Sequence, residues 1–159
     1  MADIDEFLGL HDDPDVTRFI RRLARSDGKE RLRLSERDWL ERGYGGFAVL
    51  DRGNGRFLGR TGLKYWSQFD ETELGWALRK DAWGRGYATE AARACLDWAF
   101  ASLPAPYLTA MIQPDNKPSI RVACRLGMSP LRADVLLDSP VVVYSLHRDA
   151  WSTTDEADA

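Results

Sequence analysis

In the first part of the chain, apolar side chains recur three and four positions apart, which is the period of an amphipathic helix. Three helices are predicted there: one over Ala2–Leu10, one that begins at Pro14 and ends at Ser26-Asp27-Gly28, and one that begins at Ser35 and ends between Gly43 and Gly46. The second helix has a cap in Asp13, and proline suits a first helical turn.

Shorter apolar runs bounded by turn residues follow and indicate strands. The predicted strands are Phe47–Leu50, Phe57–Tyr65, Glu73–Leu78, Tyr107–Ile112, Arg132–Leu137 and Val141–Leu146. The pair Asn54-Gly55 predicts a tight hairpin between the first two strands, and the last two form a hairpin around Asp138-Ser139-Pro140. Two more helices are predicted, one after Gly84-Arg85-Gly86 with an apolar face from Ala88 to Ala99, and one over Ser119–Leu126 that ends at Gly127.

This order of elements predicts an α+β fold in which helices flank a mixed, mostly antiparallel sheet. One parallel step, from Glu73–Leu78 through a helix to Tyr107–Ile112, should be a right-handed crossover. The chain is expected to form a single domain over residues 1–151. The acidic residues 152–159 are expected to be a disordered tail.

Composition and charge narrow the possible functions. The 159 residues are 44% hydrophobic and 30% charged, with a net charge of −3, as in one soluble domain. No uncharged stretch is as long as a membrane helix, and the acidic start is unlike a secretory or transit peptide. Mild acidity disfavours a nucleic-acid partner, and the two cysteines, Cys95 and Cys124, favour the cytoplasm. No spacing of His, Cys and carboxylates indicates a metal site.

The stretch from Glu73 to Glu90 carries the strongest chemical signal, because a strand leads through Gly84-Arg85-Gly86 into a helix. Free N–H groups and the positive end of the helix dipole bind phosphate at such a position. Tyr87-Ala88 stands where a P-loop has Lys-Ser or Lys-Thr, and Thr89 stands where a dinucleotide fingerprint has Gly or Ala. Taken alone, the turn fits either another diphosphate ligand or an ordinary helix start.

Four segments together resemble the GNAT superfamily of acetyl-CoA-dependent N-acetyltransferases, and within it the branch of the bacterial ribosomal-protein N-terminal acetyltransferases. The segments are Asp12–Arg18, Glu73–Leu78, Trp83–Ala91 and Asn116–Met128. The resemblance covers nearly the whole chain. It implies a GNAT-like fold with a central strand–loop–helix–strand cofactor unit, in which the family's first N-terminal strand is missing.

The resemblance also implies a set of cofactor-binding residues. Trp83, Gly84 and the following residues would form the pyrophosphate loop, with the diphosphate held by the backbone N–H groups of Arg85, Gly86, Tyr87, Ala88 and Thr89. Asn116, with Ser119 nearby, would contact the pantetheine arm or the thioester end. The pantetheine would lie where Glu73–Leu78 splays from Tyr107–Ile112, and an N–H near Ala77 or Leu78 would polarise the thioester carbonyl.

The implied reaction moves the acetyl group of acetyl-CoA to a primary amine, of a peptide or protein N-terminus or of a small molecule, by direct attack. Glu73 is the candidate base, acting directly or through water. Many members have a tyrosine as general acid where Ala123 stands, so Ser119 is the candidate that protonates the leaving thiolate. The alternative for Glu73 is an exposed strand carboxylate, and the alternative for Ser119 is a residue that satisfies helix N-terminal donors.

Other readings stay open at this point. The missing tyrosine and the missing first strand favour an alternative, a domain that binds CoA with little or no transfer. A ping-pong route through Cys124 is disfavoured, since no histidine lies near it in sequence. The Asp-rich start and the loop with Trp66, Asp70 and Glu71 would attract a cationic amine. Monomer and homodimer are both compatible with the sequence.

Overall fold

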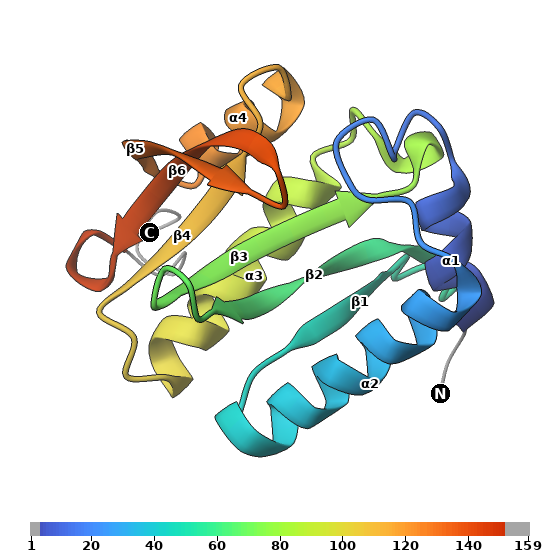
Figure 1. Cartoon of the computed structure of the whole chain (residues 1–159), viewed down its shortest axis with the longest axis horizontal. Helices are drawn as coiled ribbons and strands as arrows, with labels where there is room; N and C mark the ends of the chain where they lie inside the picture. Colours follow the sequence, from blue (N-terminus) through green and yellow to red (C-terminus); the bar gives the residue numbers. More distant parts are fainter. Residues whose placement is uncertain (1–3, 152–159) are drawn as a thin grey trace.

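A six-stranded sheet of order β1-β2-β3-β4-β6-β5 runs through the structure, a computed structural model that describes residues 4–151 (Figure 1). The strands are β1 (Gly46–Leu50), β2 (Phe57–Trp66), β3 (Glu71–Leu78), β4 (Tyr107–Ile112), β5 (Ser129–Leu136) and β6 (Ser139–His147). The helices are α1 (Ile4–Asp12), α2 (Arg25–Arg42), α3 (Tyr87–Ser102) and α4 (Lys117–Arg125), with short 3-10 turns over Lys80–Ala82 and Arg148–Ala150. The predicted α+β class is confirmed.

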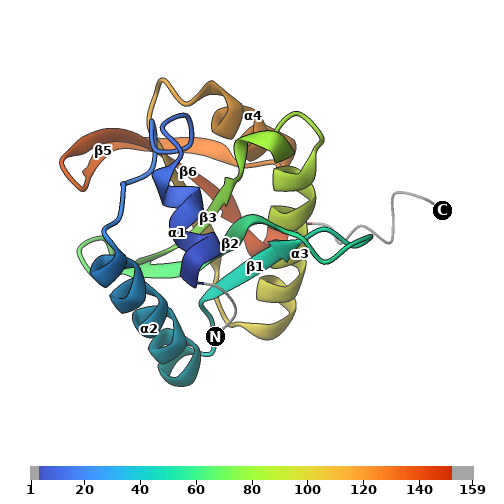
Figure 2. The same cartoon turned by 90° about the vertical axis from the view of Figure 1, so that its right-hand side faces the viewer.

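Helices cover both faces of the sheet, α1 and α2 on one and α3 and α4 on the other (Figure 2). The main core lies on the α3 side, where Leu74, Leu96 and Leu108 are at most 1% exposed. A smaller apolar cluster on the α1 side includes Leu10 and Ala77. Since side chains alternate between the faces of a strand, odd-numbered residues of β3 such as Glu73 face α1 and α2.

The two parallel neighbours, β3 and β4, separate soon after they meet. They are paired at Glu73 and Thr109, and from there they diverge (Figure 1). All other neighbouring strands are antiparallel over several residues. The splay between the two strands is therefore present, and it opens toward the end of β3 that leads into the turn before α3.

The helices before β1 differ from the prediction. The segment from Pro14 forms turns instead of a helix, with one helical bond from the Thr17 N–H to the Asp13 carbonyl. Helix α2 begins at Arg25, eleven residues after Pro14, and continues through Ser26-Asp27-Gly28 and Ser35 to Arg42. The predicted break is therefore absent, and the helix predicted from Ser35 is the C-terminal half of α2, which ends before Gly43 as expected. Gly28 is buried against Leu8, and its missing side chain allows α1 and α2 to pack closely instead of breaking the helix.

The strands follow the prediction closely. The β1–β2 hairpin turns at Asp51–Gly55, where Gly55 has a φ of 72°. The last hairpin turns slightly earlier than predicted, at Leu137 and Asp138, and β6 already begins at Ser139.

The described residues before β1 form helices and turns, which leaves β1 at the edge of the sheet. Within residues 4–151, no helix is long and apolar enough to cross a membrane. The predicted tail, 152–159, lies outside the described residues.

Candidate active site

A cleft of about 470 Å³ passes through the splay and is lined from both faces of the sheet. Its walls include the facing parts of β3 and β4 and the tip of the β5–β6 hairpin. On the α1–α2 side it is lined by Thr17–Arg21, Arg31 and Arg60, and on the α3–α4 side by Trp76, Asn116 and Ser119. The structure thus brings together Glu73, Asn116 and Ser119, three of the residues singled out from the sequence.

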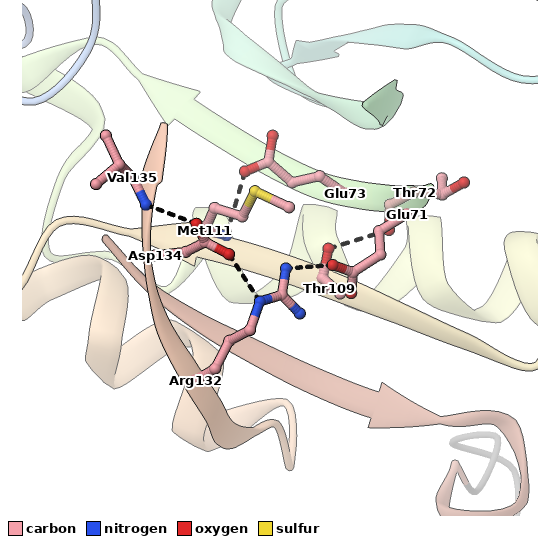
Figure 3. Close-up of polar contacts among 8 residues, drawn as sticks. All are labelled: Glu71, Thr72, Glu73, Thr109, Met111, Arg132, Asp134 and Val135. Atoms are coloured by element: carbon pink, nitrogen blue, oxygen red, sulfur yellow. Dashed lines mark hydrogen bonds and ion pairs between the residues drawn. The ribbon is translucent and has the colours of Figure 1, made fainter. Parts of the chain in front are cut away.

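Glu73 is fixed by two hydrogen bonds at the start of the splay. The Trp66 indole N–H donates to Oε1 at 3.0 Å, and the Met111 backbone N–H donates to Oε2 at 3.1 Å (Figure 3). Burial raises the pKa of the Glu73 carboxyl above its ordinary value, while these hydrogen bonds and the charges of Arg60 and Lys64 oppose the rise. The result is an oriented carboxylate of increased basicity, which is what a general base needs.

Ser119 faces the same cleft from the first turn of α4. Its Oγ lies 3.3 Å from the Trp76 indole N–H, which donates to it and leaves the hydroxyl proton available for another acceptor. Asn116, and not the Ser119 hydroxyl, caps the helix, because its Oδ1 accepts from the Ser119 N–H at 3.3 Å. Ala123 is completely buried one turn later and does not line the cleft.

The glycine turn before α3 lies beyond the cleft, at the far end of β3 (Figure 1). Gly84 and Gly86 have φ values of 73° and 77°, and a side-chain carbon added to either would meet no heavy atom within 4 Å. No side chain caps α3, so the first-turn N–H groups of Tyr87, Ala88 and Thr89 have no helical partner. Together with Arg85 and Gly86, these residues form an open shelf suited to an anion.

Trp83 supports this turn by a contact of its own. Its indole N–H donates to the Leu78 carbonyl at 2.9 Å, so the side chain ties the turn to the end of β3. The Arg79 N–H donates to Leu58 in β2, and N–H groups alternate along a strand. By this alternation the Ala77 N–H points toward β2, whereas the Leu78 N–H points toward the splay.

The acidic groups expected to attract a cationic amine are occupied elsewhere. Glu71 is buried and accepts from Arg132 of β5, which also pairs with Asp134 at 2.8 Å (Figure 3). Asp70 accepts from the Tyr65 hydroxyl at 2.6 Å, and neither carboxylate lines the cleft. The carboxylates of Glu71 and Asp70 are thus engaged in contacts outside the cleft.

Sequence reasoning missed the partners that surround Glu73. Trp66 was interpreted as part of a loop or a groove wall, and Arg31 and Arg60 were not singled out. Arg60 did leave a signal, because it is a charged residue inside the apolar strand Phe57–Trp66. Burial lowers the pKa of Arg60 to about 9 and also lowers the pKa of Arg31. No group of His, Cys, Asp and Glu within the described part of the chain is arranged to hold a metal ion.

Comparison with known protein families shows which family this chain belongs to. The sequence model of one family, described as an acetyltransferase (GNAT) domain, matches residues 1–129. The chain belongs to the GNAT acetyltransferase family. An uncharacterised relative, the YkkB protein of Bacillus subtilis (strain 168), is 36% identical over 140 residues, which is 85% of this chain and 80% of the relative.

Solved structures agree with this GNAT assignment. An acetyltransferase of Agrobacterium tumefaciens str. C58 has a TM-score of 0.81 at 30% identity, covering 92% of this chain and 86% of that one. Two structures share the fold at 16% identity. A ribosomal-protein-S5-alanine acetyltransferase of Vibrio fischeri has a TM-score of 0.72, covering 94% and 91% of the two chains. An aminoglycoside acetyltransferase in complex with coenzyme A and kanamycin has a TM-score of 0.79, covering 96% and 94%.

Proposed function

We propose that this GNAT protein transfers the acetyl group of acetyl-CoA to a primary amine by direct attack. The observation that carries the proposal is one cleft through the β3–β4 splay with Glu73 and Ser119 on its walls. Because Glu73 faces α2 and Ser119 belongs to α4, the two groups reach the cleft from opposite faces of the sheet. Amine and thioester can therefore approach each other from the two sides.

The open shelf before α3 is the proposed binding site for the CoA diphosphate. The N–H groups of Arg85, Gly86, Tyr87, Ala88 and Thr89 would hold it, as expected from the resemblance. Asn116 would contact the pantetheine arm, and the Leu78 N–H would donate to the thioester carbonyl oxygen. The relative solved with coenzyme A shares this fold and supports CoA as the carrier.

In the proposed reaction the amine nitrogen attacks the thioester carbonyl carbon and forms the new C–N bond. The C–S bond breaks, and its electron pair stays on sulfur. Glu73, directly or through one water, takes the proton that the amine nitrogen loses. Ser119 donates its hydroxyl proton to the thiolate and regains one from solvent.

The two unpaired thiols, on buried Cys95 and exposed Cys124, are compatible with a reducing cytoplasm as the proposed location.

The test is acetyl-CoA-dependent release of free CoA thiol with peptides, polyamines, aminoglycosides and amino acids as acceptors. Glu73→Gln should lower kcat/KM by about 10² or more, since it keeps the shape but loses the base. Ser119→Ala should lower kcat more than the affinity for acetyl-CoA, and Glu36→Gln on the exposed surface of α2 is the matched control.

The alternative, a domain that binds CoA without transfer, predicts a different result. Calorimetry would then show acetyl-CoA binding that Glu73→Gln leaves unchanged, while no acceptor releases thiol above the rate of hydrolysis. Thiol release unaffected by Glu73→Gln would remove Glu73 from the mechanism.

A further inference from the structure

The acceptor side of the cleft carries a strong excess of positive charge. Four arginines line it, Arg18, Arg21, Arg31 and Arg60, against one carboxylate, Glu73. Within residues 4–151, none of the four forms an ion pair, although every arginine of α2 other than Arg31 pairs with a carboxylate. The cleft therefore holds cationic groups whose charge the described protein does not balance.

Arg60 is the clearest of these groups. Its Nε is buried and has no hydrogen-bond partner among the described residues. The nearby carboxylate of Glu73 already accepts from Trp66 and Met111. Burial is the main cause that lowers the pKa values of Arg60 and Arg31, and the charge of Arg31 lowers the pKa of Arg60 further. Glu73 is the one carboxylate of the cleft, and it interacts with Arg31 and Arg60 together, so a further anion would be favoured beside these buried guanidinium groups.

The surface between Glu73 and Arg60 has room for a ligand. Gly75 lines the cleft two residues from Glu73 on the same face of β3, and a side-chain carbon added there would meet no heavy atom within 4 Å. Opposite Gly75 in the β2–β3 register is Gly62, and Arg60 is opposite Ala77. Gly75 thus leaves the surface of β3 open beside the base, whereas the position above Gly62 is filled by the backbone of Gly45 and Gly46.

We propose that the acetyl acceptor is a small anionic amine, whose acidic group binds Arg31 and Arg60 while its amine lies over Gly75 toward Glu73. The inference rests on the proposed function and names its substrate class. A guanidinium fork matches both carboxylate and phosphate, so amino acids and phosphorylated amines share the required chemistry. The same charges disfavour polyamines and aminoglycosides.

The experiment compares acceptors that differ only in the acidic group, with CoA release as the readout. Each common α-amino acid is paired with its own α-amide, and O-phosphoethanolamine is paired with ethanolamine. A carboxylate favours the protonated amine, so the amide has the larger neutral fraction at pH 7.5. A preference for the acid therefore cannot arise from amine reactivity. We expect at least one acidic acceptor to exceed its neutral partner about tenfold in kcat/KM.

Substitutions in the cleft then test which residues cause the preference for acidic acceptors. Arg31→Gln and Arg60→Gln should each raise KM for the acidic acceptor about tenfold and leave the KM for acetyl-CoA unchanged. Gly75→Val should do the same by filling the space over the sheet. Arg37→Gln, an exposed arginine of α2, is the matched control. Calorimetry with the preferred acidic acceptor and the CoA-bound protein gives a second readout, in which binding should be lost in Arg60→Gln.

Each outcome separates the two proposals. If neutral or cationic amines are acetylated as efficiently as their acidic partners, the proposal of an anionic acceptor is overturned, while acetyl transfer still stands. An unchanged acidic-acceptor KM in both arginine variants would also overturn it. Acidic amines that bind in an Arg60-dependent manner without any thiol release would support the binding site and contradict acetyl transfer. If no thiol is released and no acidic amine binds, both proposals are overturned.

Discussion

At the scale of single residues, Glu73 is held between two opposing influences. Burial favours its neutral form, whereas hydrogen bonds from Trp66 and Met111 and the charges of Arg60 and Lys64 favour the carboxylate. The net direction is a pKa above the ordinary value for glutamate. A base must be ionised to accept a proton, so kcat/KM should fall as the pH drops through this raised pKa.

Trp66→Phe should move this acidic limb of the pH profile to higher pH. The substitution removes the indole N–H that stabilises the carboxylate, and a hydrogen bond to a charged group contributes about 1.5 kcal/mol or more. That corresponds to a shift of about one pH unit in the profile of kcat/KM. Tyr65→Phe, at the neighbouring position with its hydroxyl on Asp70, is the control and should not move the limb. A limb that stays in place in Trp66→Phe would contradict Glu73 as the titrating base.

The residues found from the sequence and those that were missed differ in kind. Glu73, Asn116 and Ser119 stand in motifs whose local order carries the information. Arg31 and Arg60 are 29 residues apart and reach the same cleft only through the tertiary fold, which no local pattern shows. The role of Trp66 likewise depends on the register that places β2 beside β3.

At the scale of elements, His11 connects α1 to the segment that lines the acceptor side. Its ring is fully buried, and Nδ1 donates to the Arg21 carbonyl at 2.7 Å. Burial lowers the pKa of His11 to about 4. The unfolded chain therefore binds the proton more readily than the folded one. Stability contributed by neutral His11 is complete above the ordinary pKa and is lost as the pH falls toward 4.

Lowering the pH from 7.5 to 5 should therefore reduce the free energy of unfolding by about 2 kcal/mol through His11. The reduction should be much smaller in His11→Asn, which cannot become charged. Urea unfolding at the two pH values measures the difference, and His147→Asn, with an exposed histidine, is the control. An equal reduction in the wild type and in His11→Asn would contradict this account.

Another contact between elements is the pair of Glu71 in β3 and Arg132 in β5. Arg132→Met should lower the free energy of unfolding by about 3 kcal/mol, because the buried side chain of Glu71 would lose its guanidinium partner. The double variant Glu71→Gln, Arg132→Met should recover most of this loss. Denaturant unfolding measures both, and Arg121→Met on the exposed side of α4 is the control. Equal losses in the single and double variants would show that the ion pair is not the cause.

The prediction of whole elements succeeded where local signals dominate. The strands are short apolar runs between turn residues, and their bounds followed from the sequence within a few positions. The helices before β1 were placed wrongly because Gly28 normally indicates a helix end. In this fold Gly28 serves packing, since a side chain there would lie 2.5 Å from the Leu8 Cδ2 atom. Tertiary packing thus overrides local propensity in α2.

At the scale of the whole molecule, the sheet separates two tasks. The shelf before α3 and the groups on α4 lie toward one face, and the arginines of the acceptor side lie on the other. The cleft through the splay is where the two meet. Among the described residues, no hydrogen bond or ion pair joins the arginines to Asn116, Ser119 or the shelf, so changes to one set should leave the binding of the other substrate unaffected.

Gly86→Ala and Arg60→Gln test this separation. Gly86 has a left-handed backbone that costs other residues about 1–2 kcal/mol, so alanine should displace the first N–H groups of α3 and raise the KM for acetyl-CoA about tenfold. Arg60→Gln should raise the KM for the acceptor instead. In the double variant the effects on kcat/KM should multiply within about twofold. Arg37→Gln combined with Gly86→Ala is the control pair. A double variant far from this product would mean that the two faces are coupled through the strands of the splay, and that substrate binding on one side changes the geometry of the other.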